Sequence, residues 1–132
     1  MQTNELRIGN WVLYNDLYCK IAGIDKDQVL IEYHNGETDY CHIAYIDPIE
    51  FTEELLFEIG FVQRNDYYIL SNENMYLIYY KDSFKQELVS VVKRKRKYYC
   101  YKNELKHYDI KYLHQLQNVY YLLTGEELEV EL

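Results

Sequence analysis

The apolar and polar positions between residues 112 and 125 follow the period of an amphipathic helix. Its apolar stripe recurs at intervals of three and four residues: Leu113, Leu116, Val119, Tyr120 and Leu123. The opposite stripe is polar but uncharged, and it consists of His114, Gln117, Asn118 and Tyr121. A helix face that contacts only water normally carries charged residues, which make up 27% of this chain. We therefore predict that the uncharged stripe is an interaction surface, either for the chain's own sheet or for another molecule.

Alternation of apolar and polar residues predicts strands between residues 10 and 46. The candidate strands cover residues 10–14, 17–24, 29–33 and 38–43. Asn35-Gly36 favours a two-residue type I′ turn, because both central positions of that turn need positive φ. This turn would place Ile31 opposite Tyr40. Short strands at this spacing predict a small, bent β-barrel of SH3-like type.

A short helix is predicted after Pro48, with Thr52 as its N-cap and Gly60 as the left-handed residue beyond its end. The pattern after this central helix predicts a second antiparallel sheet. Its candidate strands cover residues 67–70, 75–80, 87–92 and 98–101. We expect the C-terminal helix to pack across this second sheet.

Residues 126–132 alternate Leu and Val with Glu, which predicts an edge strand. The expected fold class is therefore α+β. The chain is expected to divide into a β-barrel-like subdomain of residues 1–47 and a second part of residues 48–132, or to form one continuous domain.

The net charge of −8 is unevenly distributed along the chain. Residues 1–80 contain 14 acidic and four basic residues, residues 81–111 contain ten basic and four acidic residues, and residues 112–132 contain four acidic residues and no base. An acidic total argues against nucleic-acid binding by the whole surface. The basic block still leaves a confined anion site open.

Within that block, a run of five basic residues is followed directly by tyrosines. An anion or nucleic-acid-binding site would use such charges for phosphates and such rings for bases. The alternative is a solvated connection between two strands. The candidate residues are Lys93, Arg94, Lys95, Arg96, Lys97, Tyr98 and Tyr99.

Other chemistry has weaker support. Acidic residues and a histidine cluster at the Asn35-Gly36 turn, where they would share one sheet face and could do acid–base work or simply face solvent: Glu32, His34, Glu37 and Asp39. Cysteines and histidines lack the spacing of structural zinc sites: Cys19, Cys41, His42 and His107. We interpret the thiols as small core residues. Neither a metal nor a cofactor is predicted, and no nucleophile motif indicates an enzyme.

The start of the chain is polar and acidic rather than signal-like, and no apolar run reaches the length of a membrane span. These features predict a cytoplasmic protein with reduced thiols. The chain is also tyrosine-rich, with 17 Tyr against four Phe. Tyr favours strands and has a hydroxyl that needs water or a partner, so the tyrosines indicate either half-buried sheet surface or a binding surface.

Three segments, residues 4–12, 48–56 and 113–128, together resemble a family of small uncharacterised proteins of gut Bacteroidota, their phages and their mobile elements. The C-terminal segment is the most specific part of the resemblance. The family has no assigned activity, so the resemblance implies no catalytic residues. It implies a phage or mobile-element protein that works in the cytoplasm of a bacterial host cell or in the virion.

These features favour a non-enzymatic protein-interaction module of phage or mobile-element origin. Its expected partner is a protein, either a second copy of the chain in a homo-oligomer or a host protein, with no membrane and no cofactor. The alternatives are a nucleic-acid or nucleotide binder that uses residues 93–97, or an antagonist of a host defence system.

Overall fold

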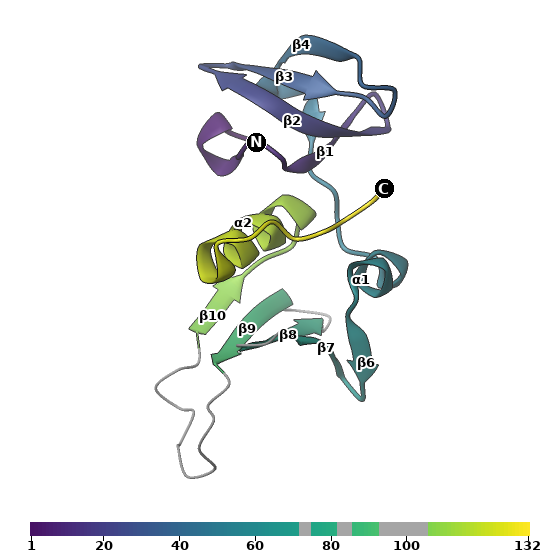
Figure 1. The fold of residues 1–132 in the computed structure, drawn as a ribbon, viewed down its shortest axis with the longest axis vertical. Coiled ribbons are helices and arrows are strands. Elements are labelled where there is room, and N and C mark those ends of the chain that lie inside the picture. The colour runs from purple at the N-terminus through teal and green to yellow at the C-terminus, as the bar shows by residue number, and fades with distance from the viewer. Residues whose placement is uncertain (72–74, 82–85, 93–105) are drawn as a thin grey trace. The chain divides into compact units, whose positions relative to one another are not determined.

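The computed structural model of the chain has an α+β fold (Figure 1). It describes residues 1–132 except for 72–74, 82–85 and 93–105. Two compact units are present: unit 1 comprises Met1–Phe51 and Tyr112–Leu132, and unit 2 comprises Thr52–Lys111. The first boundary lies close to the predicted one after residue 47. The C-terminal helix and tail, however, belong to unit 1 and not with residues 48–111.

Unit 1 contains a five-stranded antiparallel sheet in the order β4-β3-β2-β1-β5. Its strands are β1 (Trp11–Tyr14), β2 (Leu17–Asp25), β3 (Gln28–Glu32), β4 (Thr38–His42) and β5 (Ile46–Asp47). Short 3₁₀ helices cover Thr3–Glu5 and Ile43–Tyr45. A bulge between Ile21 and Gly23 shifts the pairing of β2 with β3, and bulges of this kind bend and twist a strand. Figure 1 shows the resulting curl of β1–β4, which confirms the predicted bent sheet.

The inner face of the curled sheet forms the core of unit 1. Apolar residues from every strand and from the N-terminal segment meet there: Leu6, Val12, Cys19, Ile21, Val29, Ile31, Cys41, Ile43 and Ile46. The prediction that Cys19 and Cys41 are core residues is therefore confirmed. Burial raises the pKa of both thiols, so each stays protonated near neutral pH.

The loop between β3 and β4 differs from the predicted turn. Ile31 pairs with Asp39, one residue before the predicted partner. The backbone N–H of Tyr33 donates to the carbonyl of Glu37 at 2.8 Å, and Gly36 has a φ of 83°, which together close a three-residue loop. Because a shift of one residue reverses the face of every side chain on a strand, Asp39 lies on the same face as Ile31. The predicted grouping of Asp39 with Glu32 on one face is wrong for this reason.

Helix α2 (Leu113–Thr124) belongs to unit 1 and contacts β1 there. Its first residue is tied to the end of the N-terminal region, because the N–H of Leu113 donates to the carbonyl of Ile49 at 2.9 Å. The helix ends at Gly125, which has a φ of 74°. The period of a helix shows which residues share a face, but it does not identify the surface that this face meets.

Residues 126–132 do not form the predicted edge strand. Leu128 and Val130 are buried, and the indole N–H of Trp11 donates to the carbonyl of Val130 at 3.0 Å. The tail is therefore held by buried alternate apolar residues, by the Trp11 hydrogen bond and by an ion pair between Arg7 and Glu127, without strand pairing. An extended segment that packs one side against a core has the same alternation as an edge strand.

Unit 2 contains helix α1 (Glu53–Ile59) and a second five-stranded antiparallel sheet in the order β10-β9-β8-β7-β6. The strands are β6 (Val62–Arg64), β7 (Tyr67–Ser71), β8 (Met75–Lys81), β9 (Gln86–Val92) and β10 (Lys106–Asp109). The predicted second sheet is thus confirmed, with β6 and β10 as additional strands. The strand expected at 98–101 lies outside the described residues.

The predicted caps of α1 are confirmed. The hydroxyl of Thr52 accepts a hydrogen bond from the N–H of Leu55 at 3.1 Å, and Gly60 has a φ of 114°. A side chain at Gly60 would approach the Leu70 side chain to 3.3 Å, and the rings of Phe57 and Tyr68 lie 6.0 Å apart. Helix α1 therefore packs on the face of the sheet that carries Tyr68 and Leu70.

Candidate functional site

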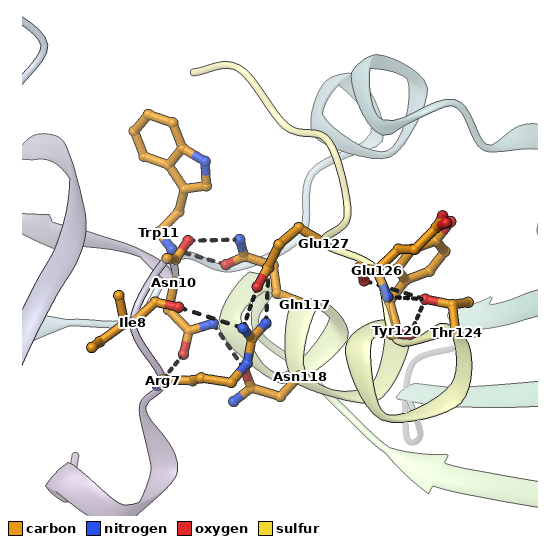
Figure 2. Close-up of polar contacts among 11 residues, drawn as sticks. Arg7, Ile8, Asn10, Trp11, Gln117, Asn118, Tyr120, Thr124, Glu126 and Glu127 are labelled. Atoms are coloured by element: carbon orange, nitrogen blue, oxygen red, sulfur yellow. Dashed lines mark hydrogen bonds and ion pairs between the residues drawn. The ribbon is translucent and has the colours of Figure 1, made fainter.

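The uncharged stripe of α2 faces the N-terminal segment of its own unit. The side-chain amide of Gln117 accepts a hydrogen bond from the backbone N–H of Trp11 at 2.8 Å and donates to the carbonyl of Gly9 at 3.2 Å (Figure 2). Gln117 is buried, and the two bonds satisfy both ends of its amide. It therefore joins the start of β1 to α2 in the way a neighbouring strand would.

Asn118 and Asn10 extend this contact. The Asn118 Oδ1 accepts hydrogen bonds from Asn10 Nδ2 at 2.8 Å and from Arg7 Nε at 3.3 Å. The Asn118 Nδ2 donates to the carbonyl of Glu5 at 3.1 Å. Asn10 is buried, and its Oδ1 accepts from the N–H of Arg7 at 2.7 Å. The polar atoms thus pair with one another, which removes the cost of burying them.

Arg7 links three parts of unit 1. Its guanidinium forms an ion pair with Glu127 in the C-terminal tail, with a second bond at 3.0 Å (Figure 2). Its guanidinium carbon also lies 4.3 Å from the centroid of the Tyr121 ring, within cation–π range. The bond to Glu127 raises the pKa of Arg7, and the bond to Arg7 lowers the pKa of Glu127. Arg7 therefore holds Tyr121 and the tail in place.

His114 is buried and its ring stacks on that of Tyr112, with a centroid distance of 5.9 Å and an interplanar angle of 10°. Its Nδ1 is buried and has no hydrogen-bond partner among the described residues. Burial lowers the pKa of His114; the nearby Glu5 carboxylate opposes this shift and the N-terminal amine adds to it. The ring is therefore neutral at neutral pH.

The stripe predicted to be an interaction surface is thus mainly an internal contact. His114, Gln117 and Asn118 contact residues of unit 1, and Tyr121 remains 43% exposed. The sequence did not single out Arg7, Asn10 or Glu127. One feature of the sequence indicated this contact. Residues 4–12 and 113–128, the two end segments of the family resemblance, are the segments that form hydrogen bonds with each other.

Apolar side chains are exposed beside this network. Leu122, next to Tyr121 in α2, is 75% exposed, and Ile8, next to Arg7, is also exposed. We call Ile8, Tyr121 and Leu122 the α2 ridge. Arginine and aromatic residues are enriched in protein–protein interfaces, and here the Arg7 guanidinium lies over the Tyr121 ring.

The predicted acid–base cluster at the β3–β4 loop is only partly assembled. A shallow cavity of about 210 Å³ is lined there by Trp11, Lys20, Glu32, Tyr33, His34 and Gly36. The Lys20 amine lies 5.0 Å from the centroid of the Trp11 ring, and the His34 ring lies 5.9 Å from it. Glu37 does not line the cavity, and Asp39 faces the other side of the sheet. Burial raises the pKa of Tyr33, and the Asp39 carboxylate adds to this shift.

Most of the candidate metal ligands lie among the described residues, whereas the candidate anion-binding residues do not. Within the part of the chain that is described, no group of three or more His, Cys, Asp or Glu residues is placed to hold a metal ion. The basic run and the two tyrosines after it, residues 93–99, lie outside the described residues, as does the side chain of His107. In the sequence, the run falls between β9 and β10 of unit 2.

Unit 2 has a sheet face that carries tyrosines. The rings of Tyr67 and Tyr80 lie 5.7 Å apart on paired positions of β7 and β8. Tyr79 lies on the opposite, buried face, where burial raises its pKa to about 12. The two faces of this sheet therefore differ, with one packed and one partly open to solvent.

Searches with the sequence and with the structure found no matching family model, no matching curated protein and no matching solved structure. Among residues 1–71, 75–81, 86–92 and 106–132, no helix is both long enough and apolar enough to cross a membrane.

Proposed function

We propose that the chain is a non-enzymatic protein-interaction module of phage or mobile-element origin, and that unit 1 binds a partner protein through the α2 ridge. The observation that carries this proposal is the exposure of Tyr121, which contacts the Arg7 guanidinium, together with that of Leu122, the next residue in α2. Neighbouring exposed apolar residues mark interaction sites when they form one patch, and tyrosine and arginine are enriched among the residues that dominate binding energy.

The charge of unit 1 indicates the kind of partner. Its residues include 13 acidic and three basic side chains, a net charge of −10. Arg7 is paired with Glu127, and Lys20 lies over Trp11, so two of the three bases are already engaged. Complementary charge favours association. The partner is therefore a protein with an apolar centre and a basic rim.

The setting of this interaction rests on the sequence resemblance. It favours a host protein or a second copy of the chain as partner, in the host cytoplasm or in the virion. An antagonist of host defence would use the same surface against a host protein. The curl of the unit 1 sheet favours an SH3-like arrangement for the module.

The test is affinity capture from a Bacteroidota lysate with the wild-type chain, followed by measurement of binding between the purified partner and the Leu122→Ser variant. Truncation of a residue at the centre of an interface weakens binding by about tenfold or more. The matched control is Tyr45→Ser, since Tyr45 is 68% exposed elsewhere in unit 1. Equal affinity of all three proteins would rule out the α2 ridge as the binding surface.

A second copy as partner is tested separately. Light scattering over a range of protein concentrations should then show a dimer or larger species for the wild type and for Tyr45→Ser, and a monomer for Leu122→Ser. A monomer at all concentrations for the wild type excludes self-association.

A further inference from the structure

Three residues on neighbouring strands form a row on the outer face of the unit 1 sheet. Trp11 of β1 pairs with Lys20 of β2, and Lys20 pairs with Glu32 of β3. Cross-strand partners share one face of a sheet. Val12 and Ile31, which are adjacent to two members of the row, belong to the core of unit 1. Because successive side chains point to opposite faces, the row faces away from that core.

The row lines the shallow cavity at the β3–β4 loop, together with Tyr33, His34 and Gly36. The cavity volume is about 210 Å³, and one water molecule occupies about 30 Å³, so the end of a single long side chain has room there. The rings of Trp11 and His34 lie 5.9 Å apart. A planar group that enters the cavity can therefore stack on an aromatic ring.

The ammonium group of Lys20 is a cation that the chain itself places in this cavity. Its Nζ lies 5.0 Å from the centroid of the Trp11 ring, within cation–π range. The Glu32 carboxylate, although directly across from Lys20, forms no ion pair or hydrogen bond with any described residue. The cavity thus holds a cation against its aromatic ring and leaves a carboxylate open to another.

The charge of the whole unit favours a cation as the ligand. All residues of unit 1 are described, and their net charge is −10. A field of this sign attracts cations to the surface and repels anions. Guanidinium is the cation that best matches the cavity, because it is planar, stacks on aromatic faces and binds a carboxylate through two parallel hydrogen bonds.

We propose that this cavity binds the guanidinium group of an arginine side chain from a partner protein. The guanidinium stacks on the Trp11 ring in place of the Lys20 ammonium and pairs with the Glu32 carboxylate. The role of the cavity as a partner contact rests on the proposed function, but the cavity shares no residue with the α2 ridge. A small arginine ligand therefore tests the cavity alone, and its failure to bind would leave the α2 ridge untouched.

The test is an NMR titration of the full chain at pH 7.5 and low salt with N-acetyl-arginine N-methylamide, whose guanidinium is its one charge. The indole N–H resonance of Trp11, the single tryptophan of the chain, reports on the cavity. The matched ligand is the corresponding citrulline derivative, which has nearly the same shape and no charge. We expect the arginine derivative to shift this resonance saturably, and the citrulline derivative to bind at least about fivefold more weakly.

Three variants at exposed positions test the proposed contacts without disturbing the core. Glu32→Gln should weaken binding of the arginine derivative about fivefold, because the ion pair is lost. Glu37→Gln is the matched control, since it removes the same charge from a residue that does not line the cavity, and it should bind within about twofold of wild type. Lys20→Met removes the competing ammonium and keeps an unbranched side chain, so it should bind about twofold more tightly or better.

Several results would overturn the proposal. They are the absence of any shift of the Trp11 indole resonance, equal binding of the citrulline derivative, and equal affinity of Glu32→Gln and Glu37→Gln. Unchanged or weaker binding in Lys20→Met would overturn it as well, because the Lys20 ammonium would then not compete with the ligand. A clear weakening in that variant would identify the cavity as an anion site instead.

Discussion

The backbone N–H of Trp11 donates to the side chain of Gln117 across 106 residues of sequence, at 2.8 Å and in a buried position. This bond fixes α2 to the first strand of the unit 1 sheet. It also explains why the stripe of α2 is polar without being charged, because a charged side chain there would be buried without an ionic partner.

Replacement of Gln117 by Ala should destabilise the chain by about 1–3 kcal/mol, because the N–H of Trp11 and the carbonyl of Gly9 would lose their partner. Urea unfolding followed by Trp11 fluorescence measures this change, since Trp11 is the chain's single tryptophan. Gln2→Ala is the control, because Gln2 is exposed, and it should change the free energy of unfolding by less than about 0.5 kcal/mol. An equal effect of the two variants would contradict the buried contact.

The buried His114 predicts a loss of stability at mildly acidic pH. Its pKa is lowered in the folded chain, so the unfolded chain binds a proton first as the pH falls below about 6.5. The neutral His114 ring contributes its full stabilisation above the unfolded pKa of about 6.5. This contribution is lost as the pH falls from there through the lowered pKa of the folded chain. Urea unfolding at pH 7.5 and 5.5 should show a smaller pH dependence for His114→Gln than for the wild type. A pKa of His114 above 6.5, measured by NMR titration, would contradict this account.

The Arg7–Glu127 pair should contribute only modestly to stability. The pKa of Glu127 is lowered by Arg7, so the contribution is present above the unfolded carboxyl pKa and is lost as the pH falls through the folded value. Because the Glu127 side chain is about half exposed, solvent screening keeps this contribution below about 1 kcal/mol. Glu127→Gln should therefore unfold at nearly the wild-type urea concentration at pH 7. A loss of several kcal/mol would show that the pair is more than a surface contact.

The thiols of Cys19 and Cys41 should resist alkylation in the folded chain. Both are buried, and burial raises the pKa of each, which lowers the fraction of reactive thiolate. Mass spectrometry after brief treatment with iodoacetamide should find the peptides that contain these residues unmodified, and modified once urea is added. Rapid modification without urea would show that the core of unit 1 opens.

Local signals in the sequence predicted most individual elements. The Thr52 and Gly60 caps of α1 formed as expected, because capping depends on residues a few positions apart. The strands of the first sheet also began and ended within about two residues of prediction, the usual uncertainty of element ends. Short strands such as Ile46–Asp47 were missed, since two residues contain no measurable period.

Long-range pairing was not predictable from the same signals. The partner of the α2 stripe lies more than 100 residues away, and the pattern left open whether it was this chain or another molecule. The Asn35-Gly36 loop contains one residue more than the favoured turn, which shifted the register of β4 and moved Asp39 to the inner face. Tyr121 was identified from its position on the stripe, whereas Leu122 was not, because an exposed Leu in a helix is unremarkable in sequence.

The most direct test of the proposed function is the affinity of the captured partner for Leu122→Ser, with Trp11 emission recorded on the same samples. We predict that binding weakens about tenfold or more, while Trp11 emission stays as in the wild type because the contact of α2 with β1 is intact. Wild-type affinity together with wild-type emission would contradict the assignment of the α2 ridge as the binding surface.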